Sequence, residues 1–225
     1  MALPKNIEWV TFDVYGTLID WENGVADAFE QEAKKDGVEI DRQQVIDLFL
    51  QYSHEIQRGS YELYAEVLRQ TAVRIAKEIG WDMEPSRSNF LPESVARWQP
   101  FKESNPQLKK FLSKYKTGLI SNIDDKLLGL TRRHIPADFD LVVTAQQVRS
   151  YKPDPAHFNE FARRIGGKKG WVHIASGVET DIEPCHKLKV PTIWVNRRKA
   201  ELPSGAKKPA AEVKSLLEAA KLLGL

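Results

Sequence analysis

Five short apolar segments place the strongest constraint on how this chain folds. Each is rich in β-branched or aromatic residues and lacks the alternation of a half-exposed strand, which favours strands covered on both faces. Helical patterns separate the last four, and this alternation indicates βαβ units and a doubly wound parallel sheet. The predicted strands are residues 8–14, 117–122, 140–145, 171–176 and 192–196.

Helical periodicity accounts for most of the remaining chain. About a hundred residues between the first and second predicted strands carry no strand signal. Their pattern predicts a helical domain inserted directly after the first strand, with glycines as helix stops. The predicted inserted helices are residues 24–37, 41–59, 60–80 and 87–99, and the later ones are 124–134, 155–166, 179–190 and 210–224.

The predicted fold class is therefore α/β: a doubly wound, Rossmann-like parallel sheet with an inserted helical cap domain. Residues 1–18 and 100–225 are expected to form the core domain, and residues 19–99 the cap. Residues 99–106 are predicted to be the hinge on which the chain returns to the core.

Composition excludes several classes of function. With 33 basic and 31 acidic residues among 225, the net charge of +2 gives no field that would recruit nucleic acid or an anionic membrane. No apolar run is long enough for a transmembrane helix, and the first residues lack the apolar core of a signal peptide. The single cysteine, Cys185, rules out an intrachain disulfide and fits a reducing compartment. We expect a cytoplasmic protein.

Polar residues follow the predicted strands where a ligand is expected to bind. In an open α/β sheet, ligands bind at the carboxyl ends of the strands. Carboxylates, a lysine, hydroxyls and an amide would therefore face one crevice. These residues are Asp13 to Thr17, Ser121, Asn122, Lys152 and Ser176 to Asp181.

Four motifs carry a resemblance to the haloacid dehalogenase superfamily. A strand ending in Asp-x-x-Gly-Thr-Leu is matched by FDVYGTL (12–18), and an apolar strand ending in Ser by LISN (119–122). The motif lysine is matched by YKPDP (151–155), and the acidic motif in part by HIASGVETD (173–181). The resemblance covers essentially the whole chain, because the helical block falls where the superfamily inserts its cap.

Tyr15 distinguishes between branches of the superfamily. Its phosphatases use Asp-x-Asp, in which the second acid protonates the leaving oxygen, and a tyrosine of pKa near 10 is poorly matched to that task. The chain resembles instead the type II 2-haloacid dehalogenases, whose signature is Asp-x-Tyr-Gly-Thr, because a leaving halide needs no proton. Ser176 also stands where the phosphatases carry an acid, so the resemblance implies no metal and no cofactor.

The resemblance assigns catalytic roles to three residues. Asp13 is the expected nucleophile, against the alternative of a strand-end aspartate that caps its turn. Lys152 is expected to keep it ionised, against that of a solvated lysine. For Asp181 two interpretations stay open: it pairs with Lys152 or activates the hydrolytic water, or it begins a helix, where the dipole favours a carboxylate.

Substrate binding is assigned to residues around these three. Ser121 and Asn122 are expected to hold the substrate carboxylate or the halide, with simple capping as the alternative. Tyr15 either lines the pocket or only packs, and Thr17 hydrogen-bonds Asp13 or the loop. Ser176 is a small polar residue of the site, and Arg58 is a candidate for the cap arginine of the dehalogenases.

Two departures from the dehalogenase pattern stand out, and two histidines need an interpretation. Phe158 replaces a tyrosine of that branch, and its Ser-Ser-Asn run is not reproduced, because the chain has Ala175, Ser176 and Gly177 there. His157 and His173 are interpreted as structural.

The expected activity is hydrolytic dehalogenation of a short 2-haloalkanoic acid through an aspartyl ester on Asp13. The alternatives are a magnesium-dependent phosphatase without the usual general acid, and a degenerate, non-catalytic member of the superfamily. The expected partner is the small-molecule 2-haloacid, and a homodimer is compatible with the resemblance.

Overall fold

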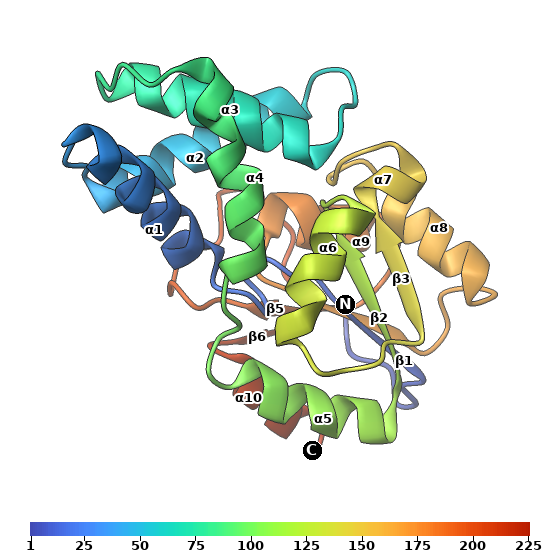
Figure 1. Ribbon diagram of the computed structural model, residues 1–225. Coiled ribbons are helices and arrows are strands. Elements are labelled where there is room, and N and C mark those ends of the chain that lie inside the picture. The colour runs from blue at the N-terminus through green and yellow to red at the C-terminus, as the bar shows by residue number, and fades with distance from the viewer. The chain divides into compact units, whose positions relative to one another are not determined.

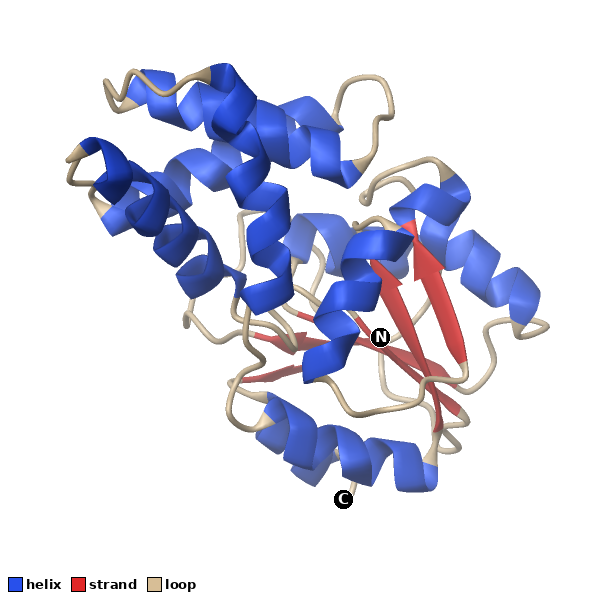
Figure 2. Cartoon of the chain, in the orientation of Figure 1, coloured by secondary structure: helices blue, strands red, loops and turns tan.

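The computed structural model describes residues 1–225 and contains one six-stranded sheet with helices around it (Figures 1 and 2). The strand order is β3-β2-β1-β4-β5-β6, and every neighbouring pair is parallel. All five predicted strands are confirmed. The strands are β1 (Trp9–Phe12), β2 (Lys116–Ser121), β3 (Leu141–Thr144), β4 (Trp171–Ala175), β5 (Thr192–Val195) and β6 (Ala211–Val213).

The strand order fixes where a ligand is expected to bind. From β1 the chain builds β2 and β3 on one side, then returns to build β4, β5 and β6 on the other. The direction of winding therefore reverses between β1 and β4. In sheets of this order the crevice lies outside the carboxyl ends of the two strands at the reversal. Asp13 directly follows β1, and Ser176 directly follows β4.

The predicted helix over residues 210–224 is wrong in its first part. Residues Ala211–Val213 form the edge strand β6, which pairs with β5 through Ile193 and Ala211. The helix α10 (Leu216–Leu222) begins only after Ser215, whose side chain accepts a hydrogen bond from the Glu218 backbone N–H. A strand of three residues is too short to show a period of two in the sequence.

The segment predicted as a return hinge, residues 99–106, also needs correction, because a helix begins inside it. This helix, α5 (Ser104–Lys114), is largely polar and buries Leu108 and Phe111 on one face. It packs against α10 (Figure 1). The other helices that follow the strands are α7 (Ala145–Val148), α8 (Ala156–Arg164), the π-helical turn η5 (Val178–Ile182) and α9 (Glu183–Lys187).

A cluster of large apolar side chains fills the space between α8 and the sheet. Phe158 and Phe161 from α8 pack on Trp171 of β4, with ring centroids 6.5 and 4.9 Å away respectively. All three side chains are fully buried. Burial of large apolar side chains stabilises a fold by roughly 1.5–3 kcal/mol each, which favours apolar residues on the face of the sheet that α8 covers.

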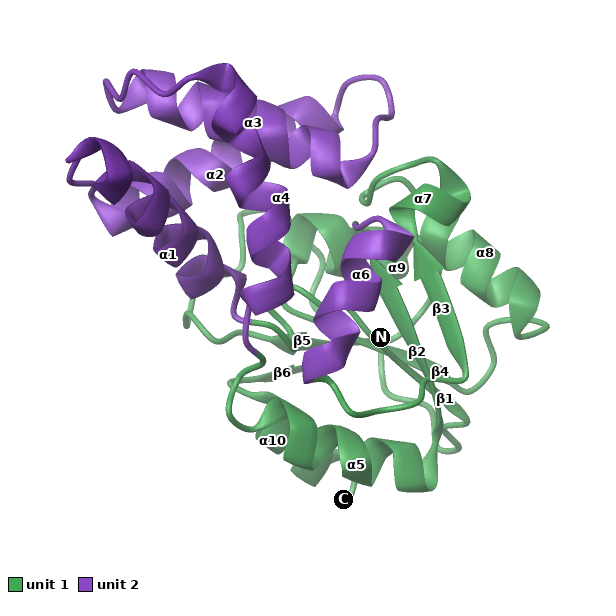
Figure 3. Cartoon of the chain, in the orientation of Figure 1, with its two compact units in different colours: residues 1–19, 100–122, 135–225 green, residues 20–99, 123–134 purple.

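The chain divides into two compact units (Figure 3). Unit 1 contains residues 1–19, 100–122 and 135–225, and therefore the whole sheet. Unit 2 contains residues 20–99 and 123–134 and is entirely helical. Its elements are α1 (Trp21–Ala33), η1 (Lys34–Asp36), α2 (Arg42–Gln57), α3 (Tyr64–Glu78), η2 (Pro85–Asn89), α4 (Phe90–Ser94), η3 (Val95–Arg97), α6 (Asp125–Thr131) and η4 (Arg132–His134).

Aspartate side chains cap the starts of two long helices of unit 2. The side chain of Asp41 accepts hydrogen bonds from two backbone N–H groups at the start of α2. At α3 the cap comes from a distant part of the chain, because Asp124 accepts from the N–H groups of Tyr64 and Ala65, both at 2.8 Å.

The predicted helix over 87–99 is instead three short helical pieces, η2, α4 and η3. None of the helices in the structure is both long enough and apolar enough to cross a membrane.

Candidate active site

The loop after β1 presents the first carboxylate. The chain leaves the strand at Asp13 and turns at Gly16, whose φ of +87° is a conformation that side-chain-bearing residues rarely adopt. The turn brings Thr17 back toward the strand end, where its hydroxyl donates to Asp13 Oδ2 at 3.0 Å. The Gly-Thr of the first motif therefore has a structural explanation, and the expected Thr17–Asp13 hydrogen bond is present.

One lysine is shared by two carboxylates at the strand ends. Lys152 Nζ lies 2.9 Å from Asp13 Oδ1 and 2.6 Å from Asp181 Oδ1. Its side chain is 2% exposed, that of Asp13 10% and that of Asp181 1%. Burial of a charge is costly unless it is paired and hydrogen-bonded, and here each charge has a partner. The interpretation of Lys152 as a solvated lysine is wrong.

The surroundings of the two carboxyl groups shift their pKa values in opposite directions. Burial is the largest influence on Asp13 and raises its pKa, because Lys152 only partly offsets it and Asp181 adds repulsion. Burial also acts on Asp181, but the charge of Lys152 and the hydrogen bond from His173 hold the pKa of this carboxyl below its usual range. The pKa of Lys152 is raised despite burial, because both carboxylates favour its charged form.

Asn122 positions the lysine through its backbone. The Asn122 side-chain amide donates to the Lys152 carbonyl oxygen at 3.1 Å, and its oxygen accepts from the Lys152 N–H at 2.7 Å. Lys152 Nζ also donates to the carbonyl oxygen of Ile120 at 3.2 Å. The end of β2 thus holds the loop that carries the lysine, and a role of Asn122 in substrate binding stays a prediction.

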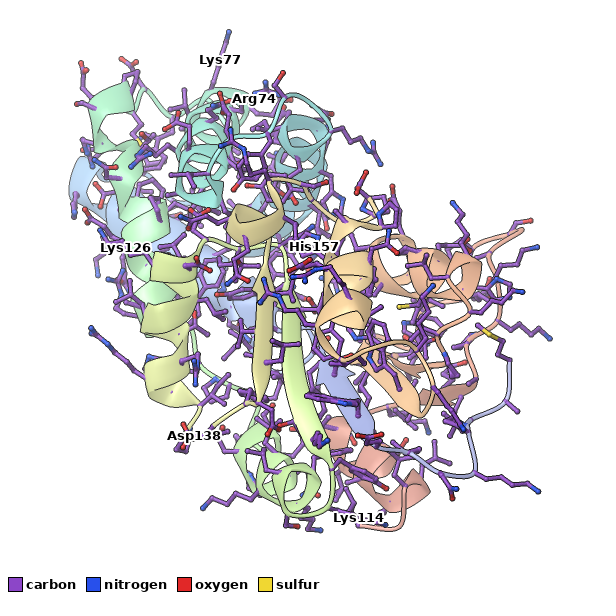
Figure 4. The ribbon with its side chains drawn as sticks, turned by 90° about the vertical axis from the view of Figure 1, so that its right-hand side faces the viewer. Arg74, Lys77, Lys114, Lys126, Asp138 and His157 are labelled. Carbon is purple, nitrogen blue, oxygen red and sulfur yellow. The ribbon has the colours of Figure 1, made fainter.

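Two polar side chains beside this group are buried without a protein partner. The Ser121 hydroxyl is fully buried and makes no hydrogen bond, and neither buried ring nitrogen of His157 makes one of good geometry. His157 lies at the start of α8 (Figure 4). Burial, together with the charge of Lys152, lowers the pKa of His157 to about 3. Buried polar groups are rarely left unpaired, so these two mark a place where a polar ligand group would be satisfied.

The remaining predicted residues fall in different places. Ser176 lies at the end of β4, and its backbone N–H donates to the Thr17 hydroxyl at 2.9 Å. Tyr15 is half-buried and forms an isolated bridge with Ile19 in the same loop. Arg58 is in unit 2, where it ends α2. Its role as the substrate-binding arginine stays a prediction.

Besides Lys152, two side chains that the sequence did not predict as partners, those of His173 and Thr180, hold the Asp181 carboxylate. His173 Nε2 lies 3.0 Å from Asp181 Oδ1, and the Thr180 hydroxyl donates to Oδ2 at 2.6 Å. A π-helical turn, η5, presents the residue, and such turns occur frequently at functional sites. Gly177 makes room here, because a Cβ at this position would lie 2.7 Å from Asp181 Oδ2. The interpretation of Asp181 as a residue that only begins a helix is wrong, since its carboxylate pairs with Lys152.

The hydrogen bonds that continue behind Asp181, from His173 to Thr11 and Trp171, were not predicted. Thr11 Oγ1 lies 2.8 Å from His173 Nδ1 and accepts from Trp171 Nε1 at 2.8 Å. A signal was present in the sequence, since a threonine and a histidine occupy otherwise apolar strands. Only the strand register, which places Thr11 opposite His173, brings the two together.

The donor set does not fit a magnesium ion, the metal associated with the superfamily's phosphatases. Asp13 Oδ1 and Asp181 Oδ1 both face the ammonium group of Lys152, and Ser176 replaces the third acid with a hydroxyl. Hard cations prefer several carboxylate and carbonyl oxygens that are not already bound to a cation. No cluster of three His, Cys, Asp or Glu side chains suited to a metal ion occurs in the structure.

Comparison with known proteins agrees with this geometry. The family model of the haloacid dehalogenase-like hydrolases matches residues 7–187. A zebrafish (Danio rerio) haloacid dehalogenase-like hydrolase domain-containing protein 3 is 26% identical over 217 residues, which are 88% of each chain. An (S)-2-haloacid dehalogenase from Pseudomonas fluorescens is 23% identical over 222 residues, 95% of each chain.

A solved structure extends the comparison to the fold. The L-2-haloacid dehalogenase from Xanthobacter autotrophicus, with chloropropionic acid covalently bound, superimposes with a TM-score of 0.82 at 18% identity. The match covers 96% of this chain and 98% of the other. The fold and the matching family model define the class of this protein as a hydrolase built on a parallel α/β sheet. The chain belongs to the haloacid dehalogenase-like hydrolase family.

Proposed function

We propose that this protein hydrolyses short 2-haloalkanoic acids to 2-hydroxy acids, with Asp13 as the nucleophile. The observation that carries the proposal is the residue pair Asp13 and Tyr15: the first carboxylate is paired with a lysine, and no acid follows two positions later. Displacement of a halide needs an ionised nucleophile and no general acid. The names of the Pseudomonas and Xanthobacter relatives support the same reaction class.

In the first step, a carboxylate oxygen of Asp13 attacks the carbon that bears the halogen. A carbon–oxygen bond forms, the carbon–halogen bond breaks, and the halide leaves with the electron pair. The charge of Lys152 favours the ionised form of Asp13 against the effect of burial, and the Thr17 hydroxyl fixes the orientation of its carboxylate. The unpartnered Ser121 hydroxyl is available to donate to the substrate carboxylate.

In the second step, water attacks the ester carbonyl of Asp13. The ester bond to the substrate oxygen breaks, which frees the hydroxy acid and restores the aspartate. One proton of the water ends on the product hydroxyl and the other is released, so the net reaction consumes water and yields halide and a proton. Asp181, both of whose oxygens accept hydrogen bonds from protein side chains, stays in place and holds Lys152 beside the ester.

The test is halide release from each enantiomer of 2-chloropropionate in the presence of EDTA. We expect the wild type to release chloride and Asp13→Asn to release none above background. Asp138→Asn is the matched control, because Asp138 is an exposed aspartate of the same unit, outside the site (Figure 4). Turnover in H₂¹⁸O, followed by mass spectrometry of the peptide that carries Asp13, should show heavy oxygen in that side chain.

Two outcomes would contradict the proposal. Chloride release that is unchanged in Asp13→Asn would exclude this carboxylate as nucleophile. Absence of release by the wild type, together with magnesium-dependent cleavage of p-nitrophenyl phosphate, would replace dehalogenation with phosphate-ester hydrolysis.

A further inference from the structure

A chain of hydrogen bonds runs from the interior of the sheet to the attacking carboxylate. It links Trp171, Thr11, His173, Asp181, Lys152 and Asp13. Its five contacts measure 2.8, 2.8, 3.0, 2.6 and 2.9 Å in that order. All six residues are buried, from 0% exposed for the three interior ones to 7% for Asp13. Only Asp181, Lys152 and Asp13 take part in the proposed reaction.

The donors and acceptors fix the direction of the interior part. The indole N–H of Trp171 can only donate, and it donates to Thr11 Oγ1. The proton of the Thr11 hydroxyl is then available to His173 Nδ1. An ionised carboxylate can only accept, so the His173 Nε2 that lies 3.0 Å from Asp181 Oδ1 is assigned a proton, which it donates to that oxygen.

The same reasoning excludes proton conduction along the chain. A proton taken up by Asp181 and passed to His173 would have to leave through Thr11 to Trp171. The indole nitrogen has no lone pair that accepts a proton, so the chain ends there. What the chain can do is hold an orientation. The ring of Phe158, packed edge to face on His173 with centroids 5.3 Å apart, fixes the imidazole plane further.

We propose that His173 is a positioning residue, which acts through Asp181 to hold Lys152 against the attacking Asp13. Its Nε2–H anchors the Asp181 oxygen to which Lys152 is bonded, while Thr180 anchors the other oxygen. With both oxygens anchored, Asp181 sets the place of Nζ between the two carboxylates. The inference rests on the proposed function, since it concerns the same site, but its first test does not depend on activity.

That test is ¹⁵N NMR of labelled protein, with the His173 signals assigned by their loss in His173→Gln. We expect a proton on Nε2 in the wild type. Thr11→Val should perturb the His173 ring signals, because it removes the hydroxyl and keeps the shape. Thr192→Val is the matched control: Thr192 lies opposite His173 on β5, is buried, and makes no hydrogen bond to it. It should leave those signals unchanged. An Nε2 without a proton would overturn the inference, whatever the substrate.

The second test compares halide release by His173→Phe and His173→Gln. The phenylalanine ring fills the space but donates nothing, so we expect kcat to fall roughly tenfold to a hundredfold, as for a lost hydrogen bond to a charged group, with little change in KM. Glutamine places a donor near the former Nε2 and should restore most of the loss. Equal kcat values for the two variants, both folded by circular dichroism, would contradict the positioning role. If the wild type releases no halide, the proposed function fails and the NMR result decides this inference alone.

Discussion

Replacement of Lys152 by methionine should expose how much the site depends on one cation. The ammonium group holds two carboxylates, both almost fully buried, at 2.9 and 2.6 Å. Removal of one partner from a buried ion pair costs about 3–5 kcal/mol, because the remaining charge is buried without compensation. We therefore expect Lys152→Met to lower the free energy of unfolding by about 3–5 kcal/mol at pH 7 and to abolish halide release.

The stability lost in Lys152→Met should become smaller as the pH falls, because proton binding is linked to folding. Without the lysine, one buried carboxyl has a folded-state pKa well above its unfolded value, so the folded state binds more protons and stability rises as the pH falls. The slope is at most about 1.4 kcal/mol per pH unit for one proton, so up to about 3 kcal/mol returns between pH 7 and pH 5. The stability regained through protonation is complete only below the ordinary pKa of a carboxyl group. It is lost as the pH rises through the raised pKa of the buried carboxyl in the folded variant.

Urea unfolding followed by tryptophan fluorescence at pH 5, 6 and 7 measures both effects. Lys116→Met is the matched control, because Lys116 also lies 2.9 Å from a carboxylate, Glu8, but the two side chains are 57% and 60% exposed. A solvent-exposed pair contributes about 1 kcal/mol or less. If Lys152→Met costs no more than Lys116→Met, or if its deficit is independent of pH, the assignment of a shared buried cation is wrong.

Two further substitutions test the surroundings of the site. The pKa of His157 is lowered to about 3 in the folded state, so the unfolded state binds more protons below pH 6.5 and stability is lost as the pH falls toward 3. His157→Gln should remove about 2 kcal/mol of that loss at pH 5 relative to pH 7, and parallel unfolding curves for the two proteins would contradict this. Gly177→Ala should reduce kcat strongly, because its methyl group meets the Asp181 carboxylate and the Thr180 hydroxyl. Gly129→Ala, on α6 with open space where the added methyl group would lie, is the control, and equal activity of both variants would show that the space at Gly177 is not needed.

The sheet and the central residues of the site were predictable from the sequence for a common reason. Short apolar strands separated by helices leave few arrangements other than a parallel sheet, and such a sheet gathers the residues that follow its strands. Asp13, Lys152 and Asp181 meet as that rule requires. The contact of Ser176 with Thr17 has the same origin.

What escaped prediction depends on neighbours that the sequence does not reveal. Strand β6 has three residues and α5 is mostly polar, so neither has a clear period of its own. A histidine in a buried strand does not by itself reveal its hydrogen-bond partners. These follow only from the strand register, which places Thr11 beside His173, and from η5, which brings Asp181 within 3.0 Å. The bonds from both ends of the Asn122 amide to the Lys152 backbone likewise depend on two segments that lie far apart in the sequence.

The two carboxylates of the site differ in a way that assigns their tasks. Asp181 accepts from Lys152, His173 and Thr180 and is 1% exposed, so its lone pairs are largely committed to the protein. Asp13 accepts from Lys152 and Thr17 alone and is 7% exposed as a whole residue, so it keeps lone pairs that no protein group uses. The more accessible acid, with lone pairs that no protein group uses, is therefore the one we propose as the nucleophile. The buried acid, whose pKa is lowered, keeps the shared lysine charged and in position.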